Sequence, residues 1–318
     1  MPRVRVRSLA KINLDLRVLS KRSDGFHDLR TIFQTVSLGD TIEIEFARAR
    51  TSRIEIDSDI DIPDNLIVKA AAAILSEMKT RARVRFRLEK RIPIGGGLGG
   101  GSSNAAAVLL ALPALAAKRV PLERLLELAS QLGSDVPFFL LGGTAVGLGR
   151  GAEVYPLPDA PSKPAVLVCP GVHVSTADAY SRLHRGLTDV IPSPIMNSFQ
   201  SLAGRVGDRG AGNGWDTVND FEAVVFRAYP QLESIKGKLL KLGARPALMS
   251  GSGSTIFGIF DSRLQRDRAL GALENELGSE KIHPVSLVNR RQYRSLWWRQ
   301  LRTEIEGKVW PPQEWLAK

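Results

Sequence analysis

A glycine-rich stretch carries the clearest chemistry in this sequence. Residues Ile94 to Asn104 read Ile-Gly-Gly-Gly-Leu-Gly-Gly-Gly-Ser-Ser-Asn, and six of these eleven residues are glycine. So much glycine costs conformational entropy, which indicates a backbone that must approach something side chains would block. Apolar and charged residues alternate before it, from Val84 to Ile92, as in a half-buried strand, and a helix-forming run follows from Ala105 to Leu112. This arrangement favours phosphate binding, because bare N–H groups and the helix dipole attract anions.

Other interpretations of the glycine stretch are weaker. The spacing Gly95-x-Gly97-x-x-Gly100 matches the dinucleotide fingerprint, but an amphipathic helix from Pro121 to Gln131 follows where that fingerprint needs a second strand. No lysine follows the glycines, as the common P-loop requires. A flexible linker is not typical between a tight strand and an alanine-rich helix. A loop of another type that holds a nucleotide triphosphate remains.

Three polar positions lie near elements that could complete such a centre. Lys11 and Asn13 lie two apart in an apolar stretch, so on a strand they share one face, which would line either a site or solvent. Asp135 follows the predicted helix that ends near Gly133, and by position alone it could cap the next element. Asn65 precedes the predicted helix Leu66 to Met78 and could cap it.

Two turns offer further candidate contacts. Phe26 and His27 follow the turn signal Asp24-Gly25, and a ring beside a histidine could hold a planar base, although Phe26 could equally be a core anchor. The segment from Ala247 to Phe260 is predicted as strand, Gly/Ser turn and strand, and its turn is either a simple hairpin or a second backbone cradle.

Size and charge limit the function further. A chain of 318 residues suggests about two domains, and 43% hydrophobic with 24% charged residues is ordinary for a globular protein. The net charge of +11 fits nucleic acid or a small polyanionic substrate. The tail from Arg290 to Arg302 mixes arginine with tryptophan and could stack bases, but more often such a segment packs its tryptophans on the body.

The chain shows no signal for secretion or membrane insertion. Its apolar runs are too short to span a bilayer, and its first residues lack the apolar core of a signal peptide. A single cysteine, Cys169, forms no internal disulfide and is predicted to be buried. We therefore expect a cytoplasmic protein without membrane partners.

Several motifs together resemble a known family. The stretch from Pro93 to Ala105 resembles the phosphate loop of the GHMP kinases, which include galactokinase, homoserine kinase and mevalonate kinase. The resemblance is closest to the family of 4-diphosphocytidyl-2-C-methyl-D-erythritol kinases and spans roughly residues 5 to 295. It includes, in order, Ala10-Lys-Ile-Asn-Leu14, Lys21-Arg-Ser-Asp-Gly-Phe-His27, Leu132-Gly-Ser-Asp-Val-Pro-Phe138 and Ser250-Gly-Ser-Gly-Ser-Thr255.

The resemblance implies a function and a set of site residues. The implied reaction is ATP-dependent phosphorylation of the 2-hydroxyl of 4-diphosphocytidyl-2-C-methyl-D-erythritol, in non-mevalonate isoprenoid biosynthesis. Lys11 and Asp135 would be catalytic, with Asp135 as the base. The family has tyrosine where this chain has Phe26, which preserves stacking on cytosine but removes a phenolic contact. Implied ATP-binding residues are Asn65, Ile94, Gly95, Gly96, Gly97, Leu98, Gly99, Gly100, Gly101, Ser102, Ser103 and Asn104. Implied substrate-binding residues are Lys11, Asn13, Phe26, His27, Asp135, Gly251, Ser252 and Gly253.

The resemblance also implies an architecture and partners. The expected fold is α+β: an ATP-binding domain like ribosomal protein S5 domain 2 over residues 1–155, and an α/β-plait domain over 156–289. A basic, tryptophan-rich tail covers 290–318, extends beyond the family's usual length and has no assigned function. ATP and Mg²⁺ are the expected cofactors; Ser102 or Ser103 could ligate the metal, but no acidic ligand stands out and no metal site is named. The protein would be a monomer or homodimer that binds small molecules, not nucleic acid as its primary ligand.

Two functional alternatives remain from the sequence. Another GHMP kinase, of the homoserine or mevalonate type, would share the fold and the glycine loop, but its substrate carries no base for Phe26 and His27 to hold. A basic nucleic-acid-binding protein is the alternative from a different class.

The pattern also gives local expectations. Strands are expected at 31–37 and 41–46 around a turn at Leu38 to Asp40, and the Gly/Pro-rich stretch 142–163 is expected to hold the domain boundary. Asn219 and Glu222 are spaced like a capping box, and 203–216 is expected to be a mobile loop. Other predicted elements are a strand at 53–57, helices at 230–242 and 263–277, and strands at 165–168 and 284–288.

Overall fold

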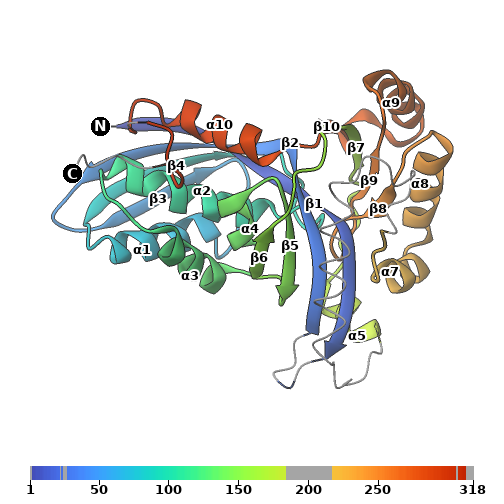
Figure 1. Cartoon of the computed structure of the whole chain (residues 1–318), viewed down its shortest axis with the longest axis horizontal. Coiled ribbons are helices and arrows are strands. Elements are labelled where there is room, and N and C mark those ends of the chain that lie inside the picture. The colour runs from blue at the N-terminus through green and yellow to red at the C-terminus, as the bar shows by residue number, and fades with distance from the viewer. Residues whose placement is uncertain (1, 22, 24–26, 184–216, 306, 313–318) are drawn as a thin grey trace.

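The molecule is built from two β-sheets with helices packed against them (Figure 1). The computed structural model describes all residues except 1, 22, 24–26, 184–216, 306 and 313–318. The predicted loop at 203–216 and the candidate residue Phe26 therefore lie outside the described residues.

The first sheet is formed mainly by the N-terminal part of the chain. Its strands follow the order β3-β4-β2-β5-β6, and β1 pairs antiparallel with β2. In β4, side chains alternate between buried and exposed along most of the strand, which confirms the predicted half-buried strand before the glycine stretch. The bounds are β1 Arg3–Lys21, β2 His27–Arg48, β3 Arg53–Ser58, β4 Ala82–Glu89, β5 Thr144–Gly149 and β6 Glu153–Pro156.

The turn predicted at Leu38 to Asp40 is wrong, because β2 runs through it without a break. A Cβ on Gly39 would lie 2.8 Å from Cδ2 of Leu9, so the glycine permits close pairing where the β1–β2 register shifts. The Asp40 side chain is fully buried and accepts a 2.5 Å hydrogen bond from Nζ of Lys90. Local composition suggested a turn, whereas these residues serve contacts with distant segments.

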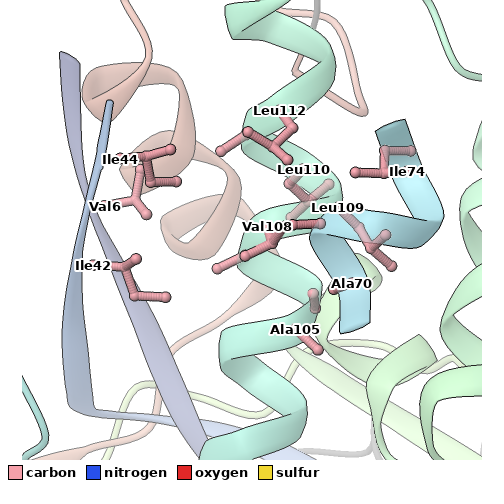
Figure 2. Packing of buried hydrophobic residues seen from close by; sticks show 14 of the residues in the cluster. Val6, Ile42, Ile44, Ala70, Ile74, Ala105, Val108, Leu109, Leu110 and Leu112 are labelled. Carbon is pink, nitrogen blue, oxygen red and sulfur yellow. The ribbon is translucent and has the colours of Figure 1, made fainter. Parts of the chain in front are cut away.

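Helices α1 to α4 cover one face of the first sheet. The central helix α2 is buried on all sides from Ser103 to Leu115, as expected for a helix that is apolar all round. Figure 2 shows its leucines between Val6, Ile42 and Ile44 on one side and Ala70 and Ile74 of α1 on the other. The helix begins at Gly100, earlier than its alanine run predicts. The bounds are α1 Leu66–Glu77, α2 Gly100–Leu115, α3 Leu122–Leu132 and α4 Val136–Leu141.

The second sheet has the order β10-β7-β9-β8 and is antiparallel throughout. The predicted helices at 230–242 and 263–277 and the predicted strands are present. The chain passes from the first sheet to the second between 156 and 164, and β5 and β6 occupy a stretch where no strand was predicted. The bounds are β7 Pro164–Val168, α5 Thr176–Arg182, α7 Glu222–Ala228, α8 Pro230–Lys241, β8 Ala247–Met249, β9 Ile256–Ile259, α9 Arg263–Leu277 and β10 Ile282–Ser286.

The last helix, α10 (Arg290–Gln300), returns to the first sheet, where Figure 1 shows it close to the N-terminal strand. Oε1 of Gln300 accepts a 2.8 Å hydrogen bond from the backbone N–H of Arg7 in β1. Tyr293 and Trp297 are each only 1% exposed in the core of the first sheet, so the prediction that the tail packs tryptophan on the body is confirmed for Trp297. Among the described helices, none has the length and hydropathy required to cross a bilayer.

Candidate active site

Lys11 and Asn13 form the buried floor of the candidate site. Their bulged strand β1 carries them into the interior, where they are 3% and 2% exposed, so the solvent-facing interpretation is wrong. Nζ of Lys11 donates to Oδ1 of Asn13 at 2.7 Å and to the carbonyl of Gly97 at 2.9 Å. The same nitrogen lies 3.4 Å from Oδ2 of Asp135, so strand, glycine loop and carboxylate meet at one ammonium.

Asp135 is placed at a helix start but does not cap it. It occupies the position before α4, yet it has helical backbone angles and its side chain makes no capping hydrogen bond. The carboxylate is 32% exposed and faces Lys11. A carboxylate with one oxygen near an ammonium and partial access to a cavity can accept a proton from a bound hydroxyl.

The first glycine loop, Gly95 to Gly101, bends beside this pair. Gly95, Gly97 and Gly99 have φ values of 73°, 76° and 69°, which glycine adopts without strain. Gly99 precedes α2 and offers no capping side chain, so the first N–H groups of the helix have no intrahelical or side-chain partner. Such groups are suited to an anion.

Some predicted loop residues point into the body of the protein instead. Leu98 is 1% exposed, and its carbonyl accepts from the N–H of Lys11. Oγ of Ser103 donates to the carbonyl of Leu9 at 2.7 Å, and Oδ1 of Asn104 accepts from a buried serine. Ile94 in contrast is 63% exposed. These buried side chains attach the loop to β1, while the loop backbone remains near the cavity.

The second glycine loop, Ser250 to Thr255, lies between β8 and β9 and contacts the first. Oγ of Ser250 donates to the carbonyl of Gly97 at 2.9 Å, and the N–H of Thr255 donates to the carbonyl of Gly96 at 3.3 Å. A Cβ on Gly97 would lie 2.1 Å from the carbonyl oxygen of Ser250. The two loops therefore pack with no room for a side chain between them.

The capping box predicted from Asn219 and Glu222 is wrong. Phe221 occupies the position before α7, without a side-chain cap. The buried amide of Asn219 donates instead to the carbonyls of Met249 and Gly251, both at 2.8 Å. A carboxylate oxygen of Glu222 accepts from the N–H of Met249 at 2.8 Å. Oδ1 of Asn219 still accepts from the N–H of Phe221 at 3.0 Å at the start of the helix, but its amide NH₂ and the Glu222 carboxylate hold the second glycine loop, whose backbone groups need partners.

An aromatic group lines the other end of the site. The ring of His27 stacks on Tyr180 with centroids 4.9 Å apart and planes 20° apart, and Phe221 meets Tyr180 edge to face at 4.8 Å. Burial, and next the negative charge of Asp135, raises the pKa of Tyr180 to about 12. Tyr180 was not among the site residues predicted from the sequence; its local signal is an aromatic residue in the short helix α5.

One cavity of about 690 Å³ connects these features. Its lining includes the predicted residues Lys11, Asn13, His27, Gly97, Gly99, Asp135, Gly251 and Ser252. Arg150, in the turn between β5 and β6, adds a cation to this lining. Asn65 is not among the lining residues: it caps α1, where Oδ1 accepts from the N–H of Ile67 at 3.0 Å, which confirms the cap interpretation.

Within the described part of the chain, no three His, Cys, Asp or Glu side chains form a group that could hold a metal ion. The cysteine Cys169 is buried, as predicted, and burial raises the pKa of its thiol to about 11.

The lining of the cavity offers a carboxylate, cations, backbone N–H groups and rings. This set is suited to an anionic ligand that also carries a planar group.

Known proteins are similar to this chain in sequence and fold. A family model described as GHMP kinases N terminal domain matches residues 65–143, and one described as GHMP kinases C terminal matches residues 200–279. A protein of Solibacter usitatus named 4-diphosphocytidyl-2-C-methyl-D-erythritol kinase is 51% identical over 97% of this chain and 96% of its own length. A protein of Citrifermentans bemidjiense with the same name is 39% identical over 82% of this chain and 91% of its own length.

Solved structures agree. The crystal structure of a 4-(cytidine 5'-diphospho)-2C-methyl-D-erythritol kinase has a TM-score of 0.71 and 36% identity, covering 89% of this chain and 98% of that one. A homoserine kinase from Cytophaga hutchinsonii has a TM-score of 0.68 at 21% identity, covering 92% and 96%, and shows the same fold.

Proposed function

Since the chain belongs to the GHMP kinases, and within them to the 4-diphosphocytidyl-2-C-methyl-D-erythritol kinase family, we propose that it phosphorylates the 2-hydroxyl of that diphosphocytidyl alcohol with ATP. The reaction belongs to non-mevalonate isoprenoid biosynthesis. The observation that carries the proposal is the Lys11–Asp135 pair, 3.4 Å apart, in a cavity lined by both glycine loops and an aromatic group.

Phosphoryl transfer requires positioning and charge stabilisation more than covalent chemistry by the protein. Asp135 accepts the proton of the substrate hydroxyl, whose oxygen forms a bond to the γ-phosphorus of ATP. The bond from that phosphorus to the bridging oxygen breaks, and ADP leaves with the electron pair. The ammonium of Lys11 stabilises the negative charge on the reacting oxygens.

The two glycine loops hold the phosphates from opposite sides. The exposed N–H groups at the start of α2 bind the triphosphate, assisted by the helix dipole. Gly251 and Ser252 line the cavity from the second sheet, and Asn13 lies beside them. The hydrogen bond from Ser250 to the carbonyl of Gly97 holds the two loops in fixed positions relative to each other.

Magnesium is expected with ATP, and the donor set fits an ion held mainly by phosphates. Mg²⁺ prefers oxygen ligands and keeps several waters when it binds through substrate phosphates. Of the two candidate serines, Ser103 already donates to Leu9, which leaves the hydroxyl of Ser102 in the first turn of α2 as the protein ligand. The ion would neutralise charge on the phosphates.

The aromatic end of the cavity suits the cytosine ring. His27 and Tyr180 present stacked rings there, and a flat base gains contact area and polar partners from such a group. Phe26, which lies outside the described residues, is proposed to stack on the same base. Homoserine and mevalonate carry no ring for these residues to hold.

Nucleic-acid binding by the tail is disfavoured by burial. Tyr293 and Trp297, which could have stacked bases, are in the core and not on the surface.

Asp135→Asn tests the base directly. The amide keeps size and shape but does not take up the proton, so turnover should fall by about 10²–10⁴-fold, with ATP affinity nearly unchanged. Coupled ADP release would be measured with the diphosphocytidyl alcohol, homoserine, mevalonate and galactose, and activity is expected on the first alone.

Asp178→Asn is the matched control, since this carboxylate on α5 is 69% exposed and does not line the cavity. It should behave like the wild type. Near-wild-type turnover of Asp135→Asn would exclude Asp135 as the base, and preference for another alcohol would overturn the substrate.

A further inference from the structure

The C-terminal segment, residues 290–312 with 306 outside the described residues, has no part in the mechanism above. We propose that it positions the active-site helix α4, and that Tyr293 and Trp310 are its positioning residues. The inference rests on the proposed function for the identity of Asp135 as the base.

Helix α4 cannot complete its own hydrogen bonding. It has six residues, Val136–Leu141, which is too short for a helix to be stable alone, and the last carbonyls of any helix lack intrahelical partners. The carbonyl of Phe138 accepts from the N–H of Gly142 at 2.9 Å. The next two carbonyls need partners from elsewhere in the chain.

The C-terminal segment provides both partners. The phenol of Tyr293 donates to the carbonyl of Phe139 at 2.5 Å, and this tyrosine is fully buried. The indole Nε1 of Trp310 donates to the carbonyl of Leu140 at 3.0 Å. Consecutive carbonyls of α4 are thus satisfied by two aromatic side chains about 150 to 170 positions later in the sequence.

The backbone after α4 is shaped to receive this segment. Gly142 has φ 65°, and a Cβ there would lie 2.2 Å from the ring of Tyr293, so the ring rests directly on the backbone. Oδ2 of Asp159 accepts from the N–H of Arg290 at 2.8 Å, while its Oδ1 accepts from the N–H of Thr144 at 3.2 Å. The start of α10 is therefore fixed to the residues that follow α4.

The other side of α4 contacts the reacting groups. Asp135 immediately precedes the helix. The Phe139 ring lies against the first glycine loop: a Cβ on Gly99 would be 2.9 Å from Cζ of Phe139 and 3.2 Å from Cγ of Lys11. The Phe138 ring packs on Phe33 with centroids 4.9 Å apart, and Nζ of Lys11 lies 5.5 Å from the Phe33 centroid. Displacing α4 would therefore move Asp135 and the support beneath Lys11 together.

The segment also makes contacts within itself around Trp310. Nε1 of Trp298 donates to the carbonyl of Val309 at 2.8 Å, within the segment. The guanidinium of Arg294 lies 5.1 Å from the Trp310 ring centroid, and Trp298 meets the same ring edge to face. These contacts pack the Trp310 ring within the segment, whereas the bond to α4 is made by Nε1 of Trp310 itself.

The test removes the two hydrogen bonds while keeping aromatic rings. In the full-length protein, Tyr293→Phe and Trp310→Phe are combined, and Trp298→Phe is the control because it loses an indole bond of the same kind and the same volume without touching α4. We expect kcat of the double variant to fall about tenfold, because a small misplacement of a catalytic group costs up to about 10²-fold in rate. The KM for ATP and the KM for the alcohol should each change by less than that. Trp298→Phe should keep kcat within about twofold.

A second readout does not depend on activity. Hydrogen exchange of the amides from Val136 to Gly142 should become at least about tenfold faster in the double variant and stay unchanged in Trp298→Phe, because lost tertiary contacts lower the local opening free energy. If exchange and kcat match those of Trp298→Phe, the segment does not position α4. Faster exchange with unchanged kcat would make the contact purely structural and overturn the positioning role. Activity retained by Asp135→Asn would instead overturn the base, and the exchange result would still decide the contact with α4.

Discussion

The two glycine loops look alike in sequence but are held by different means. In the first, Gly95 to Gly101, alternate glycines adopt positive φ and lead directly into the long buried helix α2. The second, Ser250 to Thr255, joins two short strands and depends on Asn219 and Glu222, about thirty positions earlier in the chain. Gly251 and Gly253 in the second loop also have positive φ, so the difference is that the first loop continues into a long helix, whereas the second depends in addition on side chains from another part of the chain.

This difference matters because the loops form one surface. Each belongs to a different sheet, and they meet where Ser250 contacts Gly97. A loop with its own strand and helix is stable locally, whereas a loop between short strands requires tertiary hydrogen bonds to fix its backbone. Substitutions in the first loop should therefore act at the glycines, and those affecting the second should act at a distance.

Gly97→Ala should have the largest effect. Its φ of 76° disfavours alanine, and the new Cβ would lie 2.1 Å from the carbonyl of Ser250, so the loops must separate. A displacement near 1 Å can cost about 10²-fold in rate, and we expect at least that loss in kcat/KM with the protein still folded. Steady-state kinetics and circular dichroism check this.

Gly271→Ala is the control for that experiment. This glycine lies inside α9 and not in the lining of the cavity, and a Cβ there would meet nothing within 4 Å. Activity should stay within about twofold, and the helix should gain stability, since alanine is favoured over glycine by about 1 kcal/mol. If both variants behave alike, steric exclusion between the loops is not what the glycines provide.

Asn219→Asp should have the next largest effect and tests whether the second loop is held from outside. A carboxylate would face the carbonyls of Met249 and Gly251 without donating to either. Unsatisfied buried groups cost about 1–3 kcal/mol each, and if a similar free energy is lost from transition-state binding, kcat/KM should fall roughly 5- to 150-fold. The fall should appear for both substrates.

Glu222→Gln gives a graded comparison. The amide oxygen still accepts from the N–H of Met249, so its loss should be smaller than that of Asn219→Asp. A purely structural role would lower the melting temperature of both variants without changing kcat/KM of the folded enzyme, and that result would contradict the comparison of the loops.

The same contrast explains what the sequence could predict. The glycine loop, α9 at Arg263–Leu277 and the strands of the second sheet follow from local pattern, and they were predicted. The motif that resembles the family also indicated Asp135, which lies in the cavity beside Lys11. These features are encoded by residues close together in the chain.

The features that sequence reasoning missed depend on distant contacts. Gly39 suggested a turn because its role, close packing on Leu9, is not visible locally. Asn219 was predicted to cap a helix because the same residue type can cap a helix or hydrogen-bond a distant loop, as it does here with the carbonyl of Gly251. Tyr180 lines the site because the fold brings α5 against His27, and this contact is not visible in the local sequence. In each case, a polar, aromatic or glycine residue had more than one possible partner, and the tertiary fold selected it.

Ser252→Ala should have the smallest effect and would sharpen the comparison most. The hydroxyl of Ser252 lies 2.9 Å from the hydroxyl of Thr176, at an exposed position on the rim of the cavity. If the second loop acts through its backbone, removing this hydroxyl costs at most about 0.5–1.5 kcal/mol, and kcat/KM should change by no more than about threefold to tenfold. Thr176→Val should do the same, and the double variant should show coupling only between the two hydroxyls. If Ser252→Ala alone lowered kcat/KM as much as Gly97→Ala does, the side chain of Ser252 would bind the transferred phosphate. The second loop would then be a side-chain site and not a backbone cradle, and the tether from Asn219 would serve to aim that hydroxyl.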